Sequence, residues 1–133
     1  MKNNTAFRFT YFTHKYDETC AFYTNKLGLN RAFSWDRNEH DQGSLFNAGV
    51  GLIEVLHLPR DKEKFISGLD YRPPQGAFMA IEVYDIDERF EKYKELDVRF
   101  KQEIVDQAWG HRSISVADPN GIVLFFFEDK NHV

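Results

Sequence analysis

One feature limits the folds open to this chain: the same order of predicted elements occurs twice along it. A strand is predicted at 7–14 and again at 77–85, and each is followed by an amphipathic helix, at 16–27 and at 85–96. Aromatic and β-branched residues mark the strands, and apolar residues three or four positions apart mark the helices. Three short strands follow each helix, at 30–37, 43–49 and 51–58 and at 98–106, 110–118 and 122–129. The order βαβββ thus recurs with a period of about 70 residues.

The ends of these elements carry local signals. Asp17 is the predicted N-cap of the first helix, and Gly28 is its predicted terminator. The adjacent prolines Pro73 and Pro74 interrupt both helix and sheet. We therefore expect a single domain, in which a linker at about 59–76 joins a first module at about 6–58 to a second at about 77–129.

The last predicted strand is apolar on both faces. A turn, Asp118-Pro119-Asn120-Gly121, precedes it, and every residue from Ile122 to Phe127 is apolar. Successive side chains of a strand point to opposite faces, so one face packs on a core and the other is covered or lines a cavity. The two sets are Ile122, Leu124 and Phe126, which we expect against the helix, and Val123, Phe125 and Phe127.

Composition excludes several classes of protein. The net charge is −4 and no basic block occurs, which argues against a nucleic-acid partner. No apolar run approaches the roughly 20 residues that span a bilayer, and the first residues lack the pattern of a signal peptide. The single cysteine, Cys20, excludes an internal disulfide framework and fits a reducing compartment. We expect a cytoplasmic protein with no membrane partner.

Three stretches carry a resemblance to a known family: "AFYTNKLGL", "IEVYDIDE" and "WGHRSISVADPNGIVLFFFE". Together they resemble the vicinal oxygen chelate superfamily, which holds glyoxalase I, extradiol dioxygenases and bleomycin- and fosfomycin-resistance proteins. The resemblance extends from Phe7 to Glu128. It implies an α+β fold, in which two βαβββ modules form a curved mixed sheet around a cleft and the helices cover the outer faces. It also implies a homodimer.

The resemblance further implies four metal-ligand positions, and in this sequence they are poorly suited to a metal. Counted from the matching motifs, they are Arg8, Glu54, Phe78 and Phe125. Arginine has no lone pair to donate at neutral pH and phenylalanine does not coordinate. One carboxylate does not hold a catalytic ion. We therefore expect no metal, no other cofactor and no catalytic residue at these positions.

The cleft that the resemblance implies has a mainly aromatic wall with a few polar groups, which is the usual composition of a small-molecule pocket. Strand alternation and the positions of the two tryptophans give the candidate ligand-binding residues. They are Arg8, Phe12, Trp35, Glu54, Phe78, Glu82, Trp109, His111, Ser113 and Phe125.

Three hypotheses remain open for this cleft. The first is a metal-free protein that binds, and sequesters, a drug or an aromatic metabolite. The second is a diverged lyase, isomerase or dioxygenase with a displaced site. In the third, Phe78 and Phe125 fill the cleft and Arg8 pairs with Glu54 inside it. Such a buried pair is not clearly stabilising, because desolvation offsets the attraction.

Overall fold

A computed structural model describes residues 6–38, 41–58 and 75–131. The chain divides into two compact units, Met1–Pro73 and Pro74–Val133. Each unit is described below by itself. Most of the predicted linker lies outside the described residues.

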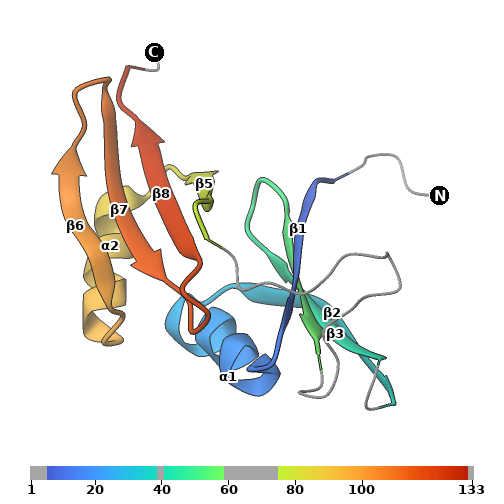
Figure 1. The fold of residues 1–133 in the computed structure, drawn as a ribbon. Coiled ribbons are helices and arrows are strands. Elements are labelled where there is room, and N and C mark those ends of the chain that lie inside the picture. Colours follow the sequence, from blue (N-terminus) through green and yellow to red (C-terminus); the bar gives the residue numbers. More distant parts are fainter. Residues whose placement is uncertain (1–5, 39–40, 59–74, 132–133) are drawn as a thin grey trace. The chain divides into compact units, whose positions relative to one another are not determined.

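The first unit contains one mixed sheet with a helix on one face (Figure 1). Its strand order is β1-β4-β3-β2, in which β1 runs parallel to β4 and the other neighbours are antiparallel. The elements are β1 (Arg8–Thr13), α1 (Tyr16–Ala21), η1 (Phe22–Lys26), β2 (Asn30–Asn38), β3 (Asp41–Asn47) and β4 (Leu52–His57).

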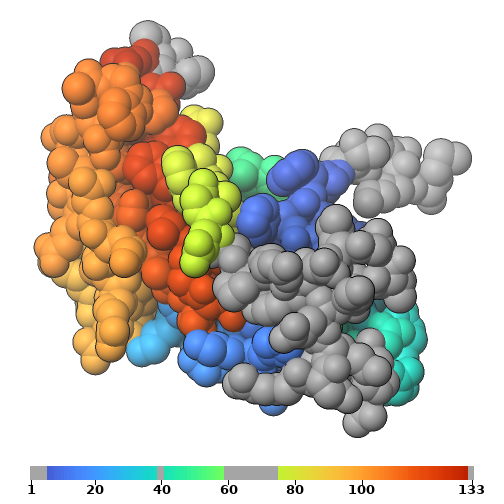
Figure 2. Space-filling model, viewed as in Figure 1, coloured from blue at the N-terminus to red at the C-terminus, as the bar shows by residue number. Residues whose placement is uncertain are grey.

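The second unit repeats this topology. Its sheet has the order β5-β8-β7-β6, again with the first and last strands of the unit parallel. Figure 2 shows β5, in yellow-green, at the edge of this sheet beside the red β8. The elements are β5 (Phe78–Glu82), α2 (Ile86–Glu95), β6 (Phe100–Asp106), β7 (His111–Ala117) and β8 (Val123–Asp129). The predicted βαβββ order is thus confirmed in both units.

The first helix differs in detail from the prediction. It continues from α1 into the π-helical turn η1, and it begins after Lys15, so the prediction of Asp17 as N-cap was wrong. Asp17 lies instead in the first turn, where an acidic side chain still interacts favourably with the helix dipole. Gly28 has φ 67°, a left-handed conformation that costs glycine little, and it ends the helix as predicted.

The core of each unit lies between its helix and one face of its sheet. In the second unit, Tyr93 of α2 contacts Phe126 of β8 edge to face, with ring centroids 5.9 Å apart, and both rings are at most 1% exposed. In the first unit, Tyr23 of η1 contacts Phe46 of β3 at 5.2 Å. The expected partition of the last strand is confirmed, because Leu124 and Phe126 are buried while the alternate residues are only partly so.

The turn before β8 also forms as predicted. The carboxylate of Asp118 accepts hydrogen bonds from the backbone N–H groups of Asn120 and Ile122, at 2.8 and 3.0 Å. Gly121 has φ 86°, which the asparagine-glycine pair permits. The turn delivers β8 beside β7 in a fixed register.

Candidate functional site

Each sheet has one face that its own helix does not cover, called here the helix-free face. In the first sheet it carries Arg8 and Glu54, the two candidate residues on β1 and β4. The guanidinium Nη1 of Arg8 lies 3.1 Å from a carboxylate oxygen of Glu54. The hydroxyl of Thr10 donates to the other carboxylate oxygen at 2.9 Å. The expected contact between Arg8 and Glu54 is therefore confirmed.

The two partners of this ion pair are not equally exposed. The side chain of Arg8 is 45% exposed and that of Glu54 is 14% exposed. Only one guanidinium nitrogen of Arg8 bonds to the carboxylate, so the pair is not bidentate. Water therefore reaches the cation, whereas the anion depends on Arg8 and Thr10 for most of its solvation.

Trp35 also lies on the helix-free face of the first sheet, away from Arg8. It pairs with Gly43 across β2 and β3, and its indole ring lies directly over that glycine. The indole N–H donates to the carboxylate of Asp41 at 2.9 Å, and the ring of Phe33 is 5.9 Å away. Trp35 thus has a structural role on this strand pair, where a side chain at position 43 would displace its ring. Phe12, the remaining candidate of this unit, follows Thr10 on the same face of β1 and pairs with Leu56.

The two sheets place their equivalent candidate positions in the same register. On β1, Arg8 lies two residues before Thr10, which pairs with Glu54 of β4. On β5, Phe78 lies two residues before Ala80, which pairs with Phe125 of β8. The side chains of each pair meet: the first pair through the ion pair, and the second through an edge-to-face contact with ring centroids 5.8 Å apart. The same backbone geometry therefore presents a charged pair in one sheet and an aromatic pair in the other.

A continuous line of rings, called here the aromatic row, crosses the helix-free face of the second sheet. The successive centroid distances are 5.8, 5.9, 4.4 and 6.2 Å. Phe78 and Trp109, at its two ends, are 60% and 57% exposed, and the three inner rings are partly exposed. In order, the row comprises Phe78, Phe125, Phe127, His111 and Trp109.

Within the row, the contact between His111 and Phe127 is a stack. Their planes differ by 15° and their centroids are 4.4 Å apart. The Nε1–H of Trp109 donates to Nδ1 of His111 at 3.0 Å. The imidazole is therefore held on one face by packing and at one nitrogen by a hydrogen bond.

Two further candidates border the row. Ser113 pairs with Phe127 and shares its face, but it is fully buried and its hydroxyl accepts a hydrogen bond from the Nε2 amide of Gln107 at 3.0 Å. A direct contact between Ser113 and a ligand would require Gln107 to move. Glu82, at the end of β5, is exposed and also pairs with Phe127.

The residues at the family's metal positions do not fit a divalent ion. In the first sheet the only oxygen ligand of the pair is Glu54, and it already binds Arg8. In the second sheet both positions are phenylalanine rings. Across the described ranges, no group of three or more His, Cys, Asp or Glu side chains could hold a metal.

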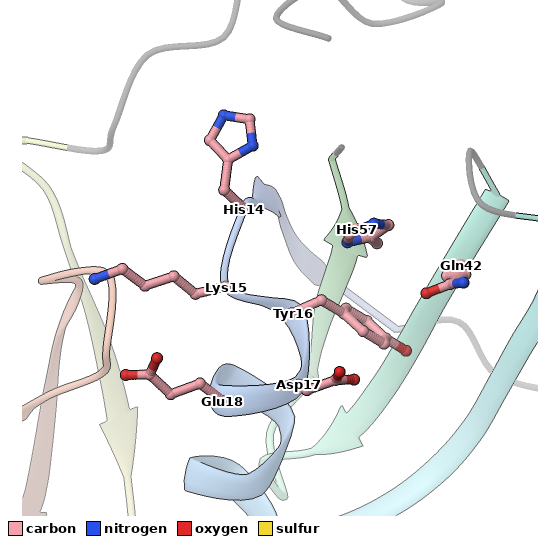
Figure 3. A pocket seen from close by; sticks show the side chains of 7 residues that line it. All are labelled: His14, Lys15, Tyr16, Asp17, Glu18, Gln42 and His57. Carbon is pink, nitrogen blue, oxygen red and sulfur yellow. The ribbon is translucent and has the colours of Figure 1, made fainter. Parts of the chain in front are cut away.

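A separate pocket of about 320 Å³ opens in the first unit at the start of α1 (Figure 3). The side chains of Tyr16, Asp17, Gln42 and His57 border one part of it, while Lys15 extends away from them. Its lining is mostly polar, unlike the aromatic row, and comprises His14, Lys15, Tyr16, Asp17, Glu18, Gln42 and His57. None of these residues was a predicted ligand contact.

Burial shapes the chemistry of this pocket. Burial raises the pKa of the Tyr16 phenol, although a 2.7 Å hydrogen bond with Ser44 partly offsets the effect. The Nδ1 atom of His57 is buried and has no hydrogen-bond partner in the part of the chain that the structure describes. The ring of His57 meets that of Tyr16 edge to face at 5.7 Å. His57 therefore packs here as an aromatic ring and leaves one polar atom unsatisfied.

The sequence and the fold can now be compared with known proteins. The model of the Glyoxalase/Bleomycin resistance protein/Dioxygenase superfamily matches residues 6–126. The chain belongs to this superfamily. A search of the curated proteins finds no significant match.

Several solved structures have a similar fold. TioX from Micromonospora sp. ML1 has a TM-score of 0.73 at 16% identity, over 95% of this chain and 99% of that one. A glyoxalase/bleomycin resistance protein/dioxygenase from Alicyclobacillus acidocaldarius has a TM-score of 0.70 at 20% identity, over 97% of this chain and 95% of that one. Lactoylglutathione lyase from Agrobacterium tumefaciens has a TM-score of 0.70 at 16% identity, over 98% of each chain. At these identities the similarity shows the shared fold alone.

Two residues of the second unit, one on β8 and one in the β6–β7 turn, were absent from the predicted ligand contacts. Phe127 was expected on the same face as Phe125, and its place at the centre of the aromatic row gives it more contacts than either terminal ring. Gln107 gave no signal in the sequence, because its role depends on the β6–β7 hairpin bringing it onto Ser113.

Neither helix length nor apolar character suffices for a membrane-spanning helix in the part of the chain that the structure describes.

Proposed function

We propose that this protein binds a small planar aromatic molecule noncovalently, with the aromatic row of the second unit as the binding surface. The observation that carries the proposal is the row itself, in which five rings are in contact on a helix-free face and both end rings are more than half exposed. Offset and edge-to-face contacts between rings are favourable beyond the area that they bury. A flat guest would extend the row by the same contacts.

Glu82 gives the aromatic row a polar side. Glu82 is exposed beside Phe127, where it would favour a guest that carries a donor or a positive group. Separately, on the first sheet, the exposed part of the Arg8 guanidinium could take an anionic group. Phe12 and Trp35 also lie on the first sheet and are not part of the aromatic row.

The proposal can be tested by titrating the protein with naphthalene and following tryptophan fluorescence. The variant Trp35→Phe leaves Trp109 as the only tryptophan of the chain, so that the signal reports on the aromatic row. We expect the emission of Trp109 to change on binding. In this background Phe125→Ala should weaken binding about tenfold, which corresponds to about 1.4 kcal/mol.

Phe33→Ala is the matched control, because Phe33 is a 56% exposed phenylalanine outside the row. Its effect on affinity should be less than twofold. Equal losses for Phe33→Ala and Phe125→Ala would show nonspecific adsorption to exposed rings and would contradict the proposal.

We also propose that the protein acts without a metal centre, because the side chains at the family's metal positions include Arg8 and two phenylalanines. Elemental analysis of the purified protein should find no stoichiometric divalent metal. About one equivalent of nickel, zinc, manganese or iron per chain would favour the alternative of a diverged lyase, isomerase or dioxygenase with a displaced site.

Finally, we propose a homodimer. Large apolar side chains remain exposed at several points on the chain, and exposed apolar patches often mark interfaces. They include Phe7, Phe33, Val50, Phe78, Tyr84 and Trp109. Light scattering at micromolar concentration should give twice the mass of the 15.7 kDa chain, and a monomer mass would contradict the proposal.

A further inference from the structure

The hydrogen bond between Trp109 and His111 determines where the imidazole carries its proton. An indole N–H can only donate. The Nδ1 atom of His111, 3.0 Å from Nε1 of Trp109, must therefore accept, and it cannot itself be protonated. In the neutral ring the single proton then lies on Nε2.

The stack with Phe127 restricts the plane in which this second N–H group lies. Because the two rings are nearly parallel, with 15° between their planes and 4.4 Å between their centroids, the imidazole is stacked on the face of the Phe127 ring. A ring N–H lies in the plane of its ring. The Nε2–H of His111 thus lies at the edge of the imidazole, in a plane nearly parallel to the Phe127 ring, where it can donate to an acceptor on a guest in that plane.

No hydrogen bond occupies Nε2 of His111 within the described ranges. His111 itself is partly exposed. The row therefore combines apolar faces, which accept any flat ring, with a single directional donor. Donors in such positions determine orientation and specificity in small-molecule sites.

We propose that His111 is the specificity-determining residue of this site and that its Nε2–H selects planar aromatic ligands with an in-plane hydrogen-bond acceptor. A pyridine-type ring nitrogen, an aryl carbonyl and a phenolate all provide such an acceptor. Trp109 is a positioning residue, because it acts by fixing the tautomer of His111. This inference rests on the proposed binding function of the row.

A pair of probes isolates this donor. Quinoline and naphthalene have nearly the same shape, but quinoline carries one in-plane lone pair. Their dissociation constants for the wild-type protein and for His111→Phe are measured by calorimetry. Phenylalanine keeps a ring on Phe127 and lacks the N–H. We expect the ratio of the quinoline constant to the naphthalene constant to rise about five- to tenfold in His111→Phe, as the loss of one net hydrogen bond predicts.

Use of this ratio cancels the different hydration of the two probes. The naphthalene constant of each protein serves only as the reference for this ratio, so a general effect of the new ring on stacking also cancels. If both probes bind but the ratio is the same in the two proteins, the inference is wrong and the binding function stands. If neither probe binds the wild-type protein, the proposed function fails and the inference fails with it.

A second measurement tests the tautomer without any ligand. In ¹⁵N-labelled protein, two-bond ¹⁵N–¹H correlations distinguish a protonated from an unprotonated imidazole nitrogen. We expect the Nε2–H form for His111 and a mixture of tautomers in Trp109→Phe. Trp109→Phe should also raise the quinoline-to-naphthalene ratio part of the way, and it replaces His111→Phe if that variant fails to fold. An Nδ1–H form in the wild-type protein would overturn the assignment.

Discussion

The ion pair between Arg8 and Glu54 allows the solvation of the first sheet's helix-free face to be measured, by removing each charge separately. Arg8→Met and Glu54→Met each remove the charged group and keep an unbranched stem of similar length. The partners differ in exposure, 45% for Arg8 and 14% for Glu54, so the residue that each variant leaves unpaired is solvated differently.

These exposures give the expected magnitudes. Arg8→Met leaves the mostly buried carboxylate with only the Thr10 hydroxyl as a partner, and a loss of about 1–3 kcal/mol follows. Glu54→Met leaves a guanidinium that water already reaches, so the loss should be below about 1 kcal/mol. Removing both groups should cost no more than Glu54→Met, because neither charge is then left buried.

Urea unfolding of the three variants and of the wild-type protein gives these free energies. Glu91→Ala is a surface control, since Glu91 forms an exposed i,i+3 pair with Lys94 at 3.2 Å and should change stability by less than about 0.5 kcal/mol. A loss of about 3–5 kcal/mol for Glu54→Met would refute the reasoning. It would mean that Arg8 is desolvated in the protein and that the cleft is filled.

Three further predictions concern packing. Phe126→Ala should lower the free energy of unfolding by about 3–5 kcal/mol, because this ring is 1% exposed. Phe78→Ala removes a 60% exposed ring and should lower it by less than about 1 kcal/mol. Equal losses of stability in thermal unfolding would contradict the assignment of the two faces. Gly43→Ala should displace the Trp35 ring, which occupies the space of the new methyl group, and an unchanged tryptophan emission spectrum and melting temperature would show that this contact is absent. His57→Phe should stabilise the protein by about 1 kcal/mol, because it removes a buried polar atom without a partner and keeps a ring at this position; a lower urea midpoint would indicate that Nδ1 is hydrogen-bonded.

The features that could be predicted from the sequence are those that depend on strand alternation. Phe125 and Phe126 lie on opposite faces of the sheet because successive side chains of a strand alternate. The contact between Arg8 and Glu54 follows once β1 and β4 are neighbours. The turn at Asp118 was equally accessible, because its residues determine their own local geometry.

The features that escaped prediction depend on particular contacts that strand alternation and residue propensity do not specify. Ser113 is fully buried and accepts a hydrogen bond from Gln107, a contact that no local pattern encodes. The N-cap prediction failed because the backbone N–H of Lys15 bonds to the hydroxyl of Thr13, at 2.8 Å, and the helix begins directly after it. The pocket beside His57 forms only when the start of α1 lies next to the ends of β3 and β4.

The pairing of β1 with β4 has the same register as that of β5 with β8, and this has a consequence for how such a protein can evolve. A substitution at position 8 or 54 meets nearly the same backbone surroundings as one at position 78 or 125. Each half can therefore gain or lose polar chemistry by side-chain replacement alone, without insertions or altered strand pairing. A chain built in this way can change its ligand in one half while the other half preserves an older specificity. Chimeras that exchange these pairs between halves should then keep their secondary structure.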